Sequence, residues 1–81
     1  MVTREQAKLI RNNLIEFRKQ VAKEQTIPPA YVFTNEELDK ILMLMPRSVA
    51  ELRRERILPD VKVHMHGEGI VNIVREGKKS V

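Results

Sequence analysis

The chain has 81 residues and a mass of 9.5 kDa, enough for one small domain that buries only about 60% of the surface its unfolded form exposes. It has no cysteine, which excludes a disulfide framework and a thiolate metal site, and no apolar run approaches the roughly 20 residues of a membrane span. Fifteen Lys and Arg against eleven Asp and Glu give a net charge of +4, so an anionic partner is plausible. We expect one intracellular domain over residues 1–81, with a core at about 4–75, a basic tail at 76–81 and no membrane contact.

The first predicted element is a helix that ends near Gln25. Thr3 and Gln6 form a capping-box pattern that opens it, and Pro28-Pro29 prevents its continuation. Its apolar stripe is Ala7, Ile10, Leu14, Phe17 and Val21. Residues 30–33 are then expected to be a short apolar connector packed against the bundle.

Two further capping patterns predict the next helices. Thr34 with Glu37 opens a helix that Pro46 closes, and Ser48 with Glu51 opens a short helix to about Arg54. The expected inward residues of these two helices are Leu38, Ile41, Leu42, Met45, Val49 and Leu52.

Two helices are expected after residue 58. Pro59 suits the first turn of the fourth, Val61 and Met65 would line its inner face, and Gly67 would stop it. A fifth helix would carry Ile70, Ile73 and Val74 and end before Gly77. Residues 61–65 alternate as a strand would, but no second strand is available to pair with them. The expected fold class is therefore all-α, a compact bundle of about five short helices.

The sequence contains little that suggests catalysis. His64 and His66 lie two residues apart and cannot share a metal ion on a helix. The carboxylates of residues 36–39 lie in a first helical turn, where the helix dipole stabilises negative charge. Gly67-Glu68-Gly69 is typical of a corner between helices. We therefore expect no catalytic residue, no metal site and no cofactor.

Basic residues on the first helix are the more informative feature. At about 100° per residue, Arg4, Lys8, Arg11, Arg18 and Lys19 fall within an arc of roughly 100°. Such an arrangement favours phosphate binding, although a solvated helix face explains it equally well. Arg53, Arg54 and Arg56 form a second cluster that allows the same two interpretations.

These segments together resemble the HRDC domain, an auxiliary module of RecQ-type helicases and RNase D-like nucleases. The family pattern is a basic amphipathic helix, a Pro-Pro segment with apolar residues, and a capped helix that ends at a proline. In this chain the pattern is represented by residues 17–24, by residues 27–35 and by the helix up to Met45-Pro46. The resemblance covers about residues 9–75 and is most specific from Phe17 to Leu52. It implies five helices with orthogonal packing similar to that of SAM domains.

The chain departs from the family pattern in two places. Many members have an aromatic residue directly after the second proline, where this sequence has Ala30 followed by Tyr31. Either burial or exposure of Tyr31 fits the sequence. The family's Gly-x-Gly turn between the third and fourth helices is replaced by residues 57–59, Ile-Leu-Pro, which offer less backbone to a phosphate.

The resemblance implies a non-catalytic accessory module of a larger enzyme, namely an ATP-dependent DNA helicase active in DNA repair and recombination. Such a module would be monomeric, lie beside the other helicase domains, and be found in the bacterial cytoplasm at the nucleoid or in a nucleus. It would hold single-stranded or branched DNA weakly. The residues expected to contact nucleic acid are Arg11, Arg18, Lys19, Lys23, Tyr31, Arg53, Arg54 and Lys62.

Two alternatives remain open. The domain could dock onto a protein or a neighbouring domain without binding nucleic acid, or it could bind RNA in an RNase D-like nuclease. Exposure distinguishes docking from nucleic-acid binding: an apolar patch of Leu9, Tyr31 and Val32 would favour docking, and one connected basic surface would favour nucleic acid.

Overall fold

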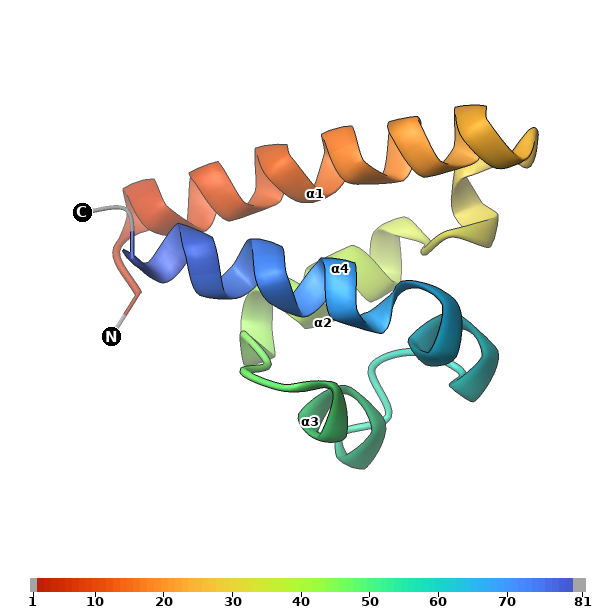
Figure 1. Ribbon diagram of the computed structural model, residues 1–81. Coiled ribbons are helices and arrows are strands. Elements are labelled where there is room, and N and C mark those ends of the chain that lie inside the picture. The colour runs from red at the N-terminus through yellow and green to blue at the C-terminus, as the bar shows by residue number, and fades with distance from the viewer. Residues whose placement is uncertain (1, 80–81) are drawn as a thin grey trace.

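The computed structural model describes residues 2–79, and these residues form four α-helices and one short 3-10 turn (Figure 1). The helices are α1 (Arg4–Gln25), α2 (Asn35–Leu44), α3 (Val49–Arg54) and α4 (Asp60–Lys79), and the turn η1 (Pro29–Tyr31) lies between α1 and α2. The all-α class is confirmed, with four α-helices in place of about five. None of the helices in this part of the chain is both long and apolar enough to cross a membrane.

The first two capping boxes form as predicted. The Thr3 hydroxyl accepts a hydrogen bond from the Gln6 backbone N–H at 3.1 Å, and the Gln6 side chain accepts one from the Thr3 N–H at 2.9 Å. Thr34 and Glu37 make the same reciprocal pair at the start of α2, at 3.1 and 2.7 Å. Both helix starts therefore satisfy backbone donors that would otherwise lack partners.

The third predicted capping box forms only in part. The Ser48 hydroxyl accepts from the Glu51 N–H at 3.2 Å, but the Glu51 carboxylate accepts from the Arg47 N–H, one residue before the cap. Helix α3 begins and ends where the sequence predicts, at Val49 and Arg54.

The predicted helix end at Gly67 is wrong, and so is the end before Gly77. Helix α4 runs without interruption from Asp60 to Lys79, so residues 76–79 are helical and not a tail; residues 80–81 lie outside the described part. The glycines allow close helix packing instead. A Cβ at Gly77 would overlap Cγ1 of Ile10, and one at Gly69 would lie 2.6 Å from Cε1 of Phe17, so both glycines let α4 approach α1.

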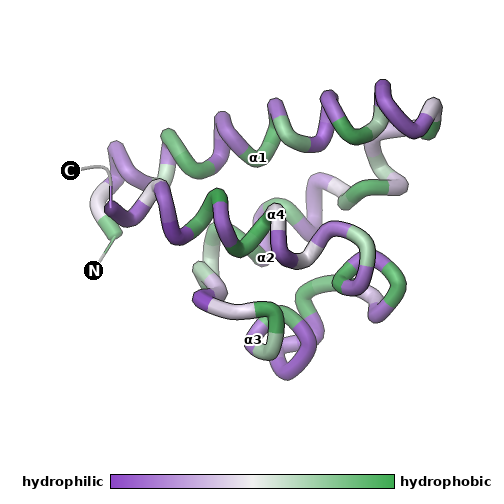
Figure 2. Tube along the Cα trace, in the orientation of Figure 1, coloured by the Kyte–Doolittle hydropathy of each residue, from purple (hydrophilic) through white to green (hydrophobic). Residues whose placement is uncertain are grey.

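The core lies between α1 and α4 and is completed by α2, α3 and the residues after η1. Helices α1 and α4 lie side by side and antiparallel (Figure 1), and Figure 2 shows hydrophobic and hydrophilic residues alternating along α1. Ile10, Leu14, Phe33, Ile41 and Ile70 are completely buried. The apolar stripe predicted for the first helix is thus the face that packs on α4.

The inner face predicted for the start of α4 is wrong. Val61 and Met65 are exposed, while Val63 and His66 are buried. Helical periodicity allowed either phase, and packing against α3 and against Phe17 of α1 selects the face that contains Val63 and His66.

Candidate functional site

Lys62 is a structural residue and not a free cation. Its Nζ atom lies 2.7 Å from Oε1 of Glu37 in α2 and donates a second hydrogen bond to the carbonyl of Ala30 in η1, at 3.2 Å. Its side chain is 17% exposed. Three elements thus meet at one ammonium group, which leaves Lys62 little capacity to bind an external phosphate.

The environment of Glu37 keeps this ion pair charged. Burial raises the pKa of the Glu37 carboxyl group, but hydrogen bonds from Lys62 and Thr34 and the positive charge of Lys62 lower the pKa further, so the net shift is downward. The carboxylate both caps α2 and holds α4 against it.

Arg18 is also engaged within the fold. Its Nη1 atom donates to the carbonyl of Phe33 at 3.2 Å and to Oδ1 of Asn35 at 3.0 Å. Its guanidinium carbon lies 5.3 Å from the centroid of the Phe33 ring, within the range of a cation–π contact. Arg18 therefore ties α1 to the segment that enters α2.

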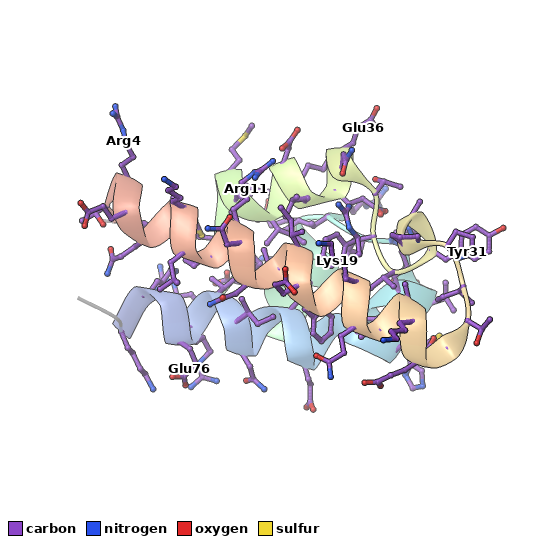
Figure 3. The ribbon with its side chains drawn as sticks, turned by 90° about the horizontal axis from the view of Figure 1, so that it is seen from above. Arg4, Arg11, Lys19, Tyr31, Glu36 and Glu76 are labelled. Atoms are coloured by element: carbon purple, nitrogen blue, oxygen red, sulfur yellow. The ribbon has the colours of Figure 1, made fainter. Side chains whose placement is uncertain are left out.

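The remaining cations of α1 form an exposed row that we call the basic stripe, shown in part in Figure 3. Its members are Arg4, Lys8, Arg11, Lys19 and Lys23, and all of them are exposed. At 1.5 Å per residue the stripe is about 28 Å long. Glu16 lies 3.8 Å from the ammonium group of Lys19, and both side chains are well exposed, so this pair leaves the lysine accessible.

Tyr31 is exposed, at 66% of its surface, and points away from the helices beyond the end of α1 (Figure 3). The exposed side chains of Val61 and Met65 line the same pocket. Val32 is completely buried, so the patch of Leu9, Tyr31 and Val32 considered above does not form. An apolar patch of different composition lies at this position.

The arginines at the end of α3 point in different directions. Arg53 and Arg56 line a groove together with Lys40 of α2. Arg54 is not among the residues that line this groove, and its Nε atom lies 3.8 Å from Oε1 of Glu55. The structure thus separates Arg53 from Arg54, which the sequence analysis expected to contact nucleic acid together. It places two further cations beside Arg53, namely Lys40 and Arg56, which were not among the expected contacts.

His66 is buried, whereas His64 is exposed. It is 5% exposed, and its ring lies edge-on to Phe17 at 6.5 Å between centroids. Burial, and secondarily the charge of Lys62, lowers the pKa of the imidazole. Within residues 2–79, no group of three or more His, Cys, Asp or Glu side chains could hold a metal ion.

The chain matches the HRDC domain model over residues 8–74. It belongs to the HRDC domain family. No curated protein and no solved structure gives a match. HRDC domains are non-catalytic accessory modules that bind nucleic acid or take part in interactions, and the compact helical bundle described above agrees with this family.

Proposed function

We propose that this HRDC domain holds single-stranded DNA weakly through the basic stripe, as an accessory module of a larger helicase. The observation that carries the proposal is the exposed row of five cations along α1, with the exposed ring of Tyr31 beyond the end of that helix (Figure 3). Backbone phosphates would lie along the stripe, and a base could stack on Tyr31, which contributes about 1–3 kcal/mol for each stacked base. Of the residues expected from the sequence, Arg11, Lys19, Lys23 and Tyr31 keep this role.

Binding of this kind is weak and sensitive to salt. Each phosphate contact to a single strand contributes about 0.7 to the slope of log K against log salt, and the described residues include no motif that reads base edges. Charge contacts alone do not distinguish DNA from RNA. The DNA assignment, the helicase context and a cellular location at the nucleoid or in the nucleus come from the resemblance.

An NMR titration of the domain with an oligothymidylate of about 12 nucleotides tests the proposal. Amides along α1 and η1 should shift at low salt, and the shifts should shrink at physiological salt. Replacement of both Lys19 and Lys23 by Gln should weaken binding. Arg75→Gln, at an exposed position of α4, is the control and should leave the affinity unchanged. Unchanged affinity in the double variant would contradict the proposal.

A second function is supported by the apolar patch of Tyr31, Val61 and Met65, whose side chains are 66%, 63% and 57% exposed. Exposed apolar side chains that share a pocket are typical of docking surfaces. In that case the partner would be a neighbouring domain of the parent enzyme, and the titration with oligothymidylate would produce no shifts.

A further inference from the structure

A groove separate from the basic stripe lies between the start of α2, the end of α3 and the loop before α4. We call it the cationic groove. It is lined by Thr34, Glu36, Glu37, Lys40, Arg53, Arg56, Ile57, Leu58, Pro59 and Asp60. It shares no residue with the stripe, and α3 lies on the side of α4 away from α1 (Figure 1).

Three cations of this groove are available to a ligand. Lys40, Arg53 and Arg56 are exposed, and none of their side chains makes an ion pair or a hydrogen bond with another described residue. This holds although the carboxylates of Glu36 and Asp60 line the same groove. The groove therefore presents three cations against the carboxylates of Glu36 and Asp60, which leaves a net charge of +1 for a ligand.

The third carboxylate of the groove does not compete for these cations. The charge of Glu37 is balanced by Lys62 at 2.7 Å, and its side chain is only 14% exposed. Ile57 and Leu58 also line the groove, but they are only 1% and 4% exposed and present little surface to a ligand.

The backbone at Arg56 allows a clean test of its side chain. Arg56 has a φ of 51°, the left-handed region that favours glycine. Arg56 lies just after α3, and its N–H donates a hydrogen bond to the carbonyl of Arg53 at 3.1 Å. The N–H of the next residue, Ile57, donates to the carbonyl of Leu52 at 3.2 Å. Glycine would keep both bonds and relieve the backbone, so Arg56→Gly removes the cation without weakening the turn.

We propose that the cationic groove is a second binding site for phosphate groups of a nucleic-acid backbone, distinct from the basic stripe. The inference rests on the proposed function. Guanidinium groups suit this ligand because their planar arrangement of N–H donors binds phosphate oxygens in pairs. Lys40 of α2 would add a point charge. With the basic stripe as the first site, one nucleic acid would be held at two surfaces of the domain.

The test is the titration with oligothymidylate, extended to the groove. In the unchanged protein, amides of residues 34–40 and 53–60 should shift together with those of α1. The double change Arg53→Gln and Arg56→Gly should abolish the shifts in the groove and keep those along the stripe. It should also reduce the salt slope by about 0.7 for each phosphate that the groove no longer binds. Arg54→Gln, on the same helix but outside the groove, is the matched control and should change neither.

The outcomes separate the two proposals. Shifts along α1 without shifts in the groove would overturn the second site and leave the first standing. No shifts at either surface would overturn both. A further titration uses inorganic phosphate at the same concentration of phosphate groups as the oligothymidylate. If it produced equal amide shifts in the groove, the groove would be a site for small anions, and its assignment to nucleic acid would be overturned.

Discussion

The ammonium group of Lys62 lies 2.7 Å from the carboxylate of Glu37 and 3.2 Å from the carbonyl of Ala30. This contact joins α4, α2 and η1, and both Lys62 and Ala30 line the same pocket as Tyr31. Lys62 therefore acts on the position of Tyr31 from within the fold, whatever ligand the domain binds. An assay that measured binding alone would misassign such a residue as a ligand contact.

A double-mutant cycle tests this structural role. Lys62→Met leaves the Glu37 carboxylate half-buried without its cation, and we expect a decrease of about 2 kcal/mol in the free energy of unfolding. Glu37→Gln keeps the cap on Thr34 and should cost less. Because the two residues contact each other, the double variant should be more stable than the sum of the single effects predicts. Additive effects in urea unfolding would show that the pair contributes nothing.

The glycines of α4 give a second prediction. Gly77→Ala would place a methyl group against buried Ile10, whereas at Gly67 the nearest atom to a Cβ is Cγ1 of Val63, at 3.3 Å. Overpacking typically costs about 1–3 kcal/mol, while alanine in place of glycine favours a helix by about 1 kcal/mol. We therefore expect Gly77→Ala to be less stable than Gly67→Ala by at least about 1 kcal/mol in thermal or urea unfolding. Equal stabilities would mean that α1 and α4 separate easily at Gly77.

The sequence predicted the features that depend on near neighbours. The boxes at Thr3 and Thr34 join residues three positions apart, and the apolar stripe of α1 repeats within a single helix. Features that join distant segments were not predictable in this way. From the sequence, Arg18 and Lys62 were expected to be free cations, because their hydrogen-bond partners lie 15 and 25 residues away, on other elements.

The roles of Gly77 and His66 also depend on segments that are distant in the sequence. Gly67 and Gly77 fit a helix end as well as a close helix contact, and only the position of α1 shows that Gly77 serves the second role. His66 and Val63, one turn earlier, lie on the same face of α4, and both are buried. No local signal separates that phase from the one in which Met65 faces inward.

Acidification should destabilise the fold in two steps. The pKa of His66 is lowered from its usual 6.5, so the unfolded chain binds a proton more readily and stability falls as the pH drops below about 6.5. The pKa of Glu37 is lowered from 4.5, so a second decrease begins below about pH 4.5 and continues until the carboxylate is protonated in the folded state. Thermal unfolding across this pH range should show both decreases.

Variants assign the two steps. His66→Gln cannot titrate and should remove the first step while it keeps the second. Glu37→Gln should weaken the second step alone. A first step of unchanged size in His66→Gln would assign it to another group and contradict the role of the buried imidazole.

Arg18 and Lys19 are adjacent in the sequence but should respond to substitution in opposite ways. Arg18→Gln removes hydrogen bonds to Phe33 and Asn35 and the contact with the Phe33 ring, so we expect it to lower the free energy of unfolding by about 1–2 kcal/mol. Lys19→Gln removes an exposed cation whose pair with Glu16 contributes little. It should leave stability unchanged and weaken the binding of oligothymidylate. The check is urea unfolding and fluorescence anisotropy of the same two variants. If Lys19→Gln lowered stability and Arg18→Gln did not, the division of α1 into an internal arginine and an exposed basic stripe would be wrong.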